Sequence, residues 1–478
     1  MVKRKVSGDN GNVTKSIPVA HQLSDLEISE VRSKLLAWYD ANKRDLPWRK
    51  QASNPDINQR AYAVWVSEIM LQQTQVATVI NYYNKWMKKW PTLQDLASAS
   101  LEEVNEMWSG LGYYSRGRRL FEGAKKVVDE LDGEMPKDAD SLLKHLPGVG
   151  KYTAGAIASI AYNQCTGLVD GNVIRVLSRL RMIGADSTSQ PVIDALWSLA
   201  NAVVDKERPG DFNQSLMELG ATVCTPKSPD CAACPLRNNC KAYAKVEQQR
   251  IKNSEKLTSI ASEKNAVIDI ECLADQCSLC LPDMETYDDS AGVTNYPRKG
   301  KKRAPREERT AVCVLCRKTP TDEEFLIRQR PEKGLLAGLW EFPSKLLVGE
   351  GESLPYSDVL IEHGVEVLYA TKKIRCGEVV HIFSHIHQTY DVEGVIAGDS
   401  DIQEDTENRD QARYRWVTRQ QFSEAAVSTA MRKVFKAFES ATNPKTPSSK
   451  DSKLTKLKPK EDKNQKSIAS FFKPKTTA

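Results

Sequence analysis

Glu68 is a carboxylate in an unusual sequence environment. It lies within an apolar run whose helical period begins at Ala61, so its side chain falls on or beside the apolar stripe. Partial burial would raise the pKa of this group, keep it protonated near neutral pH and allow it to act as an acid. The same pattern also fits a glutamate paired with an arginine at the edge of the stripe.

Asp170 is a second carboxylate that could take part in chemistry, and a glycine turn precedes it. Leu146 to Gly150 (LPGVG) is a tight hairpin whose two glycines can take positive φ, and a helix signal follows over Tyr152–Tyr162. A helix entered in this way offers backbone N–H groups and a positive dipole end to a phosphate. Asp170-Gly171-Asn172 lies at the start of the next helix. Taken alone, the hairpin is also typical of a plain loop, and the triplet of a turn with an N-cap.

Four cysteines in close succession could hold a metal centre. Their spacing is C-x6-C-x2-C-x5-C, and they are Cys224, Cys231, Cys234 and Cys240. Such thiolates bind zinc or a four-iron four-sulfur cluster, and spacing in general does not decide between the two. Because the cysteines are clustered and no secretory signal is visible, we expect metal ligands in a reducing compartment and not disulfides.

A second group has the spacing C-x4-C-x2-C and consists of Cys272, Cys277 and Cys280. Three thiolates at this pitch suggest a zinc site that lacks one ligand. A histidine, water or a cysteine from elsewhere could complete it; those cysteines are Cys165, Cys313, Cys316 and Cys376. Free cysteines are the alternative.

Helices would position these side chains in the first half of the chain. Ser24-Asp25-Leu26-Glu27 is a capping box that predicts a helix through Tyr39. Helical patterns then recur with short turns, and no strand pattern appears before residue 300. The further predicted helices are Leu101–Trp108, Arg116–Leu131, Ala139–His145, Val173–Ile183, Gln190–Val204 and Asp211–Ala221.

The second half of the chain contains the strand-forming segments. Strand-forming residues begin at Thr310 and recur at Glu324–Arg330 and Glu378–Ala397, and a last helix is expected near Ser423–Phe438. The sequence therefore predicts a multidomain protein with an all-α domain over 25–245, a polar connector over 246–309 and an α+β domain over 310–440. Residues 1–24 and 441–478 are expected to be disordered tails.

Charge is concentrated outside the predicted domains. The formal net charge is +5, yet residues 443–478 hold ten lysines against three acids, and residues 298–309 hold seven basic residues against two glutamates. The predicted domains are therefore not uniformly basic, so any grip on a nucleic acid there must be local. No apolar run is long enough to span a bilayer, and we expect no membrane association.

Three segments carry a family resemblance. Residues 46–49 (LPWR), 67–76 (SEIMLQQTQV) and 110–116 (GLGYYSR), with the hairpin and Asp170, resemble the MutY-type adenine DNA glycosylases of the helix-hairpin-helix, endonuclease III superfamily. The resemblance implies base excision repair: adenine opposite 8-oxoguanine or G is flipped out and its N-glycosidic bond is hydrolysed.

The resemblance also implies roles for the pocket residues. Glu68 would protonate N7 of the adenine, Asp170 would lie as an anion below the oxocarbenium sugar, and Asn172 would orient the pair. Tyr152 occupies the position where bifunctional relatives carry a Schiff-base lysine, so strand cleavage should be weak. Lys151 is adjacent and is a reason for caution.

Further residues would contact DNA. Gln73 would wedge into the duplex and Tyr113 would intercalate beside the damaged partner base, since an aromatic ring can stack on any base. The backbone of the hairpin residues Gly148, Val149 and Gly150 would hold a phosphate. By the same resemblance the first four cysteines hold an iron–sulfur cluster, with Arg237 and Lys241 adding a basic loop. In vertebrate relatives the fourth ligand of the connector site is a cysteine, whereas this chain has Ser178 there.

The C-terminal domain resembles a second family. Arg330–Pro343 (RPEKGLLAGLWEFP) is similar to the opening of a Nudix domain, but no magnesium-binding acidic cluster follows, so we expect a Nudix-like fold without hydrolysis. In MutY enzymes a Phe-Ser-His loop senses 8-oxoguanine, and Phe383, Ser384 and His385 match it. Three nearby histidines (His381, His385 and His387) could instead bind a metal. Cys313 and Cys316 should point to opposite faces of a strand.

The basic tail ends in a peptide with the spacing of a sliding-clamp motif: Gln465, Ile468, Phe471 and Phe472. One turn puts the apolar residues on one face, where they could fill a pocket of the clamp, PCNA. The resemblance adds the checkpoint clamp and AP endonuclease as partners of the connector. We expect a monomeric, nuclear protein, with a mitochondrial form left open. The alternatives are an endonuclease III-like pyrimidine glycosylase/AP lyase and a non-catalytic DNA-binding repair adaptor.

Overall fold

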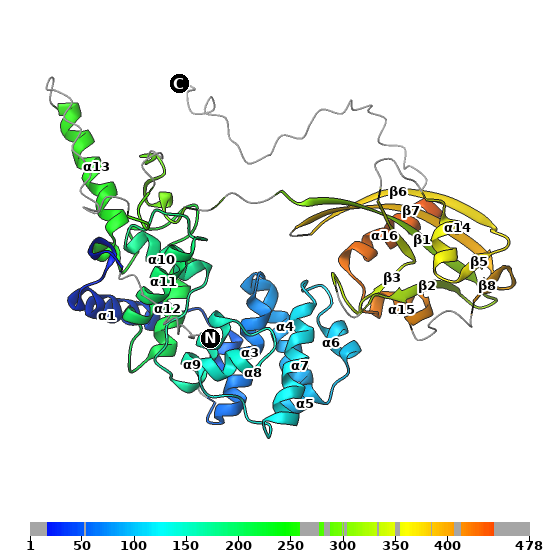
Figure 1. Ribbon diagram of the computed structural model, residues 1–478, viewed down its shortest axis with the longest axis horizontal. Helices are drawn as coiled ribbons and strands as arrows, with labels where there is room; N and C mark the ends of the chain where they lie inside the picture. The colour runs from blue at the N-terminus through cyan, green and yellow to red at the C-terminus, as the bar shows by residue number, and fades with distance from the viewer. Residues whose placement is uncertain are drawn as a thin grey trace, which may run out of the picture.

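A computed structural model describes residues 17–51, 54–258, 277–281, 287–298, 300, 304–331, 334–348, 354–383, 385–405 and 413–443. Figure 1 shows a helical N-terminal domain and a C-terminal domain built around a curved sheet. This confirms the predicted multidomain fold. Several predicted features lie outside the described residues: Cys272, Ser384 and the clamp-type peptide at 465–472.

The helical domain contains the helices predicted from Leu101 to Ala221, with bounds close to those expected, and also α2, α5 and α13, which were not predicted. Serine and threonine side chains form capping boxes at Ser24, Thr92 and Ser100, and the box predicted at Ser24 is present. The helices are α1 (Asp25–Asn42), α2 (Pro47–Lys50), α3 (Ile57–Leu71), α4 (Val76–Lys89), α5 (Leu93–Ala97), α6 (Leu101–Met107), α7 (Ser115–Glu130), α8 (Ala139–His145), α9 (Lys151–Tyr162), α10 (Gly171–Leu180), α11 (Gln190–Val203), α12 (Pro209–Thr222) and α13 (Lys241–Thr258).

Two apolar cores stabilise this domain. One is built from α2 to α9, includes the fully buried Trp65, Trp86 and Trp108, and continues into the C-terminal domain; the other is built mainly from α1 and α10 to α12. Helix α3 is buried from Ala61 to Met70 without interruption. Glu68 belongs to that stretch, so the cores hold its carboxyl group inside the domain.

The C-terminal domain is a mixed sheet with the strand order β3-β2-β1-β7-β6; β4 pairs with β1 and β9 with β2. Strand β1 runs parallel to β7, while the other pairs are antiparallel. Cys313 and Cys316 lie in different apolar cores, on opposite faces as expected. The elements are β1 (Arg306–Lys318), β2 (Glu323–Gln329), β3 (Trp340–Glu341), β4 (Ser344–Leu347), α14 (Tyr356–Glu362), β5 (Val365–Val367), β6 (Lys372–Ile382), β7 (Ile386–Gly398), β8 (Ile402–Glu404), β9 (Tyr414–Thr418), α15 (Arg419–Glu424) and α16 (Thr429–Thr442).

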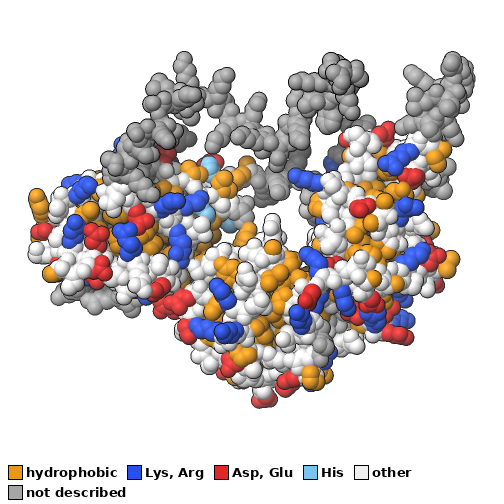
Figure 2. Space-filling model, turned by 180° about the vertical axis from the view of Figure 1, so that it is seen from behind, with side chains coloured by type: hydrophobic (Ala, Val, Ile, Leu, Met, Phe, Trp, Pro, Cys, Tyr) orange, Lys and Arg blue, Asp and Glu red, His pale blue; other side chains and the backbone are white. Residues whose placement is uncertain are grey.

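The two domains touch beside the GLGYYSR segment. Arg432 donates from Nη2 to the Ser109 hydroxyl at 3.3 Å, and Arg415 forms an ion pair with Glu102 at 3.1 Å. The C-terminal domain therefore packs against the loop that leads to Tyr113. Figure 2 shows basic and acidic side chains mixed over both domains, which agrees with the expectation that the domains are not uniformly basic.

Two predicted segment boundaries need correction. Residues 17–24 were expected to belong to a disordered tail, but His21 is buried and its Nδ1–H donates a hydrogen bond to the Arg181 carbonyl at 2.9 Å. The connector was expected to be polar with little secondary-structure pattern, but α13 extends into it, and Leu279 and Tyr296 are buried against the helical domain. Both departures rest on contacts with residues distant in the sequence, which local composition does not reveal. No described helix is long and apolar enough to cross a membrane.

Candidate active site

A pocket of about 460 Å³ lies between the two cores of the helical domain. This volume is in the range of ligand-binding pockets. Helices α3, α9, α10 and α12 supply its walls. All four residues predicted to be catalytic line it: Glu68, Tyr152, Asp170 and Asn172. Helices separated by long stretches of sequence thus bring together both carboxylates and their neighbours.

The Glu68 side chain is only 5% exposed. Its Oε2 accepts a hydrogen bond of 2.6 Å from the Tyr152 hydroxyl. Burial raises the pKa of Glu68 to about 7, even though the bond from Tyr152 acts in the opposite direction. This carboxyl group is therefore partly protonated near neutral pH, as an acid requires. The alternative, a glutamate ion-paired at the edge of the stripe, does not describe Glu68.

Tyr152 lies on the first turn of α9 and is held by two contacts. Its hydroxyl reaches Glu68 and lies 3.2 Å from the Met217 sulfur. Burial, with the two nearby carboxylates, keeps the pKa of Tyr152 far above its ordinary value, so the hydroxyl stays a donor. The neighbouring Lys151 places its Nζ 4.1 Å from the centre of the Trp197 ring and is not among the residues that line the pocket.

Asp170 is the N-cap of α10. Its Oδ1 accepts from the backbone N–H groups of Asn172 (2.9 Å) and Val173 (2.7 Å), and its Oδ2 accepts from the Asn172 amide at 2.8 Å. Burial raises the pKa of Asp170, and these three bonds oppose that rise. Because Glu68 accepts one such bond in the described structure and Asp170 accepts three, we infer that Asp170 is the carboxylate that stays ionised.

Several residues of the pocket were not predicted from the sequence. Glu218 on α12 is buried and forms ion pairs with Arg44 at 2.7 Å and Arg49 at 2.8 Å. Burial opposes its ionisation, but the two guanidinium groups outweigh burial, so the pKa of Glu218 lies below its ordinary value. The signal was present: like Glu68, Glu218 interrupts an apolar helical run, and Arg49 belongs to the LPWR segment.

Arg175 connects the pocket to the cysteine loop. Its Nη2 donates to the Asn172 side-chain oxygen at 2.8 Å, and its Nε donates to the Cys224 carbonyl at 2.6 Å. One side chain therefore joins the residue that orients Asp170 to the first of the four clustered cysteines. The sequence offered no sign of this link.

The residues predicted to enter DNA lie on the surface. Gln73 is exposed and Tyr113 is 47% exposed, and both have left-handed backbones with φ of +56° and +49°. In the hairpin only Gly148 has positive φ (+76°), whereas Gly150 is an extended N-cap at φ −95°. The Val149 side chain is buried, so the hairpin can offer only its backbone and the start of α9 to a phosphate.

The four clustered cysteines line one small cavity with Arg179 and Arg237. No three of these thiols come within 4.8 Å of one another among the described side chains. Four thiols around one cavity can supply the ligands of zinc or of an iron–sulfur cluster. Lys241, expected to face DNA, instead donates to the Ala20 carbonyl.

His21, Cys277 and Cys280 form a second candidate metal site. Their ligand atoms lie within 4.8 Å of one another, and the His21 Nε2 is 3.5 Å from the Cys277 sulfur and 3.4 Å from that of Cys280. Imidazole and thiolates at this spacing suit zinc. Ser178 is buried on α10, and the structure offers His21 as a ligand in place of the fourth cysteine that the resemblance implied.

The C-terminal domain carries the predicted recognition loop at the turn between β6 and β7. Phe383 donates its backbone N–H to the Ile386 carbonyl, and its ring packs against His381 at 4.6 Å. His385 is exposed at the same turn, and His387 contacts Glu307 at 2.6 Å. Within the described part of the chain these three histidines do not form a group that could bind a metal.

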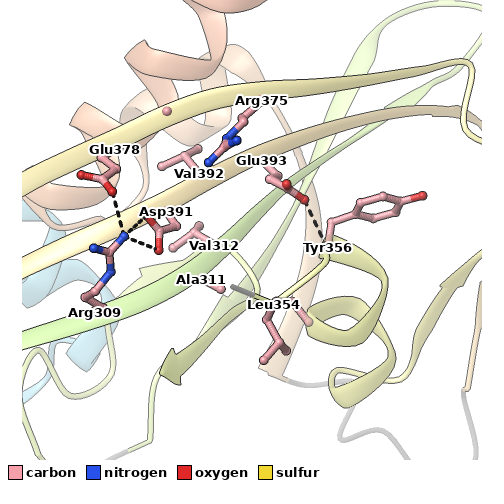
Figure 3. Close-up of a pocket in the computed structure, with 12 residues that line it drawn as sticks. Arg309, Ala311, Val312, Leu354, Tyr356, Arg375, Glu378, Asp391, Val392 and Glu393 are labelled. Carbon is pink, nitrogen blue, oxygen red and sulfur yellow. Dashed lines mark hydrogen bonds and ion pairs between the residues drawn. The ribbon is translucent and has the colours of Figure 1, made fainter. Parts of the chain in front are cut away.

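A further pocket, with a volume of about 180 Å³, lies on the sheet of this domain, and its lining residues are drawn in Figure 3. Arg309 pairs with Glu378 at 2.7 Å and with Asp391 at 2.8 Å, and Glu393 accepts from the Tyr356 backbone N–H. The carboxylates in this pocket are thus already engaged. That the domain does not hydrolyse nucleotides stays a prediction.

Known proteins resemble both halves of the chain. Residues 66–202 match the HhH-GPD superfamily base excision DNA repair protein family, and residues 311–437 match the NUDIX domain family. The helical fold and these matches define a base-excision DNA glycosylase with a Nudix-like domain.

Adenine DNA glycosylase from Homo sapiens is 53% identical over 431 residues, covering 89% of this chain and 77% of that protein. The Rattus norvegicus enzyme is 52% identical over 427 residues, covering 88% and 80%. The chain belongs to the adenine DNA glycosylase family. Among solved structures, the C-terminal domain of mouse MUTYH in complex with human PCNA is 36% identical over 28% of this chain and 88% of that chain, with a TM-score of 0.24.

Proposed function

We propose that this adenine DNA glycosylase is monofunctional and removes adenine opposite 8-oxoguanine or G. The observation that carries the proposal is the pairing, in one pocket, of a buried glutamate hydrogen-bonded to Tyr152 and an aspartate held by three N–H donors. One carboxyl group can donate a proton while the other remains an anion, which is the division of labour in glycosidases. The pocket presents tyrosine where a lyase would need an amine nucleophile.

The chemical roles follow from these environments. Glu68 protonates N7 of the extruded adenine, so the base leaves neutral, and Asp170 stabilises the positive charge that develops on the sugar. Asn172 and Arg175 hold Asp170 in orientation. Gln73 and Tyr113 enter the duplex, and the hairpin and Arg237 bind phosphates.

The proposal is tested by single-turnover excision with duplexes containing A opposite 8-oxoguanine, A opposite G, A opposite T and an oxidised pyrimidine. We expect excision from the first two and no borohydride-trapped enzyme–DNA adduct. Excision of the pyrimidine with such an adduct would favour the endonuclease III-like lyase. Binding without excision of any base would favour the adaptor.

The 8-oxoguanine preference is assigned to Phe383, Ser384 and His385 at the β6–β7 turn. Ser384→Ala removes a hydroxyl that can hydrogen-bond the damaged base, and such a loss is worth roughly 1 kcal/mol, about fivefold. We expect the preference for A:8-oxoguanine over A:G to narrow by about this factor, measured as the ratio of single-turnover rates at subsaturating enzyme. An unchanged ratio would contradict the assignment of Ser384.

Two metal groups belong to the proposal. The cavity lined by Cys224, Cys231, Cys234 and Cys240 would hold a four-iron four-sulfur cluster, which orders the loop carrying Arg237. His21, Cys277 and Cys280, with Cys272, would hold one zinc ion that ties the N-terminal segment and the connector to α10.

Removal of the histidine tests the zinc site. We expect His21→Ala to lower both the zinc content of the purified full-length chain, measured by elemental analysis, and its melting temperature, because a ligand bound only to the folded state stabilises it. Cys165→Ser, at an exposed cysteine outside the group of His21, Cys277 and Cys280, is the matched control. Zinc content that does not change in His21→Ala would rule out this ligand set.

The partners follow from sequence features outside the described residues. Gln465, Ile468, Phe471 and Phe472 would bind the sliding clamp, and the connector would bind the checkpoint clamp and AP endonuclease. A nuclear location, with a mitochondrial form left open, accords with these partners.

A further inference from the structure

Arg116, on the first turn of α7, is a buried arginine that binds two separate segments. Its Nη1 donates to the carbonyls of Ile69, at 3.0 Å, and Met70, at 2.8 Å, and also to that of Gln72. Its Nη2 donates to the Thr74 hydroxyl at 3.1 Å and to the carbonyls that precede Tyr113, those of Leu111 at 3.4 Å and Gly112 at 3.0 Å. One guanidinium therefore joins the end of α3 to the GLGYYSR segment.

The two segments share a feature that local sequence does not explain. Each carries one exposed residue with a left-handed backbone, Gln73 in the first and Tyr113 in the second. Such conformations are strained for residues other than glycine and persist only where the surroundings enforce them. Arg116 binds the residues on both sides of Gln73 and the two residues before Tyr113, and its cation lies 5.4 Å from the centre of the Tyr113 ring.

A purely structural role would explain only part of this arrangement. The carbonyls of Ile69 and Met70 belong to the last turn of α3, and a cation there is an ordinary way to cap a helix. The bonds to Thr74, Leu111 and Gly112 lie outside α3 and do not serve that purpose. A lysine could cap the helix, but its point charge cannot span both segments as the planar guanidinium does.

We propose that Arg116 is a positioning residue that fixes the spacing and orientation of Gln73 and Tyr113, so that both enter the duplex together. The inference rests on the proposed insertion of these two side chains into DNA. It goes further in assigning their register to one buried side chain that touches neither DNA nor the adenine. Its removal should impair extrusion of the base and leave the chemistry in the pocket intact.

Two duplexes separate extrusion from chemistry. In the first, adenine is opposite 8-oxoguanine; in the second, the same adenine is opposite an abasic-site analogue, where no partner base must be unpaired. Single-turnover rates are compared for wild type and Arg116→Lys. We expect Arg116→Lys to lower the rate roughly 10–100-fold on the paired duplex, which is the size of effect that misplacement by an ångström causes. On the duplex with the abasic-site analogue, we expect the loss in rate to be several-fold smaller.

The control is Arg32→Lys. Arg32 also donates to several backbone carbonyls, those of Ala202, Val203 and Val204, but it joins no loop that enters DNA. We expect Arg32→Lys to lower the single-turnover rate by similar, small factors on both duplexes. If Arg116→Lys does not fold, as judged by its melting curve, Thr74→Val removes a single Arg116 partner beside Gln73 and should show the same selective loss at smaller size.

If Arg116→Lys lowers the excision rate by the same factor on both duplexes, the inference is overturned. The same holds for Thr74→Val if Arg116→Lys does not fold. Wild-type protein that excises adenine from neither duplex would instead contradict the proposed function, so the two failures are distinguishable.

Discussion

Glu68→Gln is expected to lower the single-turnover rate of adenine excision by about 10²–10⁴-fold, the usual contribution of a general acid. Glutamine has the same shape and can still accept the hydrogen bond from Tyr152. It cannot donate a proton to N7, so the adenine would have to leave as an anion. The rate is measured with excess enzyme on a duplex containing A opposite 8-oxoguanine, and the melting temperature shows whether folding is intact.

The excision rate should also depend on pH if Glu68 is the acid. The pKa of Glu68 is raised to about 7, and only the protonated form can act as an acid. The wild-type rate should therefore fall as pH rises through about 7, whereas the residual rate of Glu68→Gln should lack this fall. Excision by the variant at nearly the wild-type rate would show that another group supplies the proton.

Asp170→Asn is expected to lower the same rate by about 10²–10³-fold, the loss seen when one electrostatic contact to a transition state is removed. Asparagine is as good an N-cap as aspartate, so α10 should keep its start. What disappears is the negative charge beneath the sugar. Substrate affinity, measured by binding to a duplex with a non-cleavable adenosine analogue, should change much less than the rate.

Asp138→Asn is the matched control for this prediction. Asp138 is also an N-cap, accepting from the Ser141 backbone N–H at the start of α8, but it does not line the pocket. We expect it to leave the excision rate unchanged. If both variants lowered the rate equally, the effect of Asp170→Asn would belong to helix capping and not to the charge.

The fold could be predicted well wherever the signal is local. Capping boxes, apolar periodicity and glycine turns depend on residues a few positions apart, and the helices from Ala139 to Thr222 begin and end close to their expected positions. The contacts of residues 17–24, 277–281 and 287–298 were missed because they are made with α10 and the residues that follow it. Local composition there is polar and carries no periodic signal.

The candidate site, too, could be predicted only where the signal is local. Both carboxylates stood out in the sequence, one because it interrupts an apolar stripe and the other because it precedes a helix. Their protonation did not follow from those patterns alone, since the pKa of Glu68 depends on burial by helices α3, α9 and α12. Glu218 also interrupts an apolar helical run, but its pairing with Arg44 and Arg49 could not be predicted, because these ion pairs join residues more than a hundred positions apart.

The sequence by itself determined that an all-α domain precedes a strand-rich one, and it determined the paired acids, the two groups of cysteines and the family to which the chain belongs. Only the tertiary structure decided that His21 meets Cys277 and Cys280, and that Arg116 joins two surface loops. The physical reason is that helix and strand formation depends on near neighbours. Burial, electrostatic environment and bridging hydrogen bonds arise only when distant segments pack together.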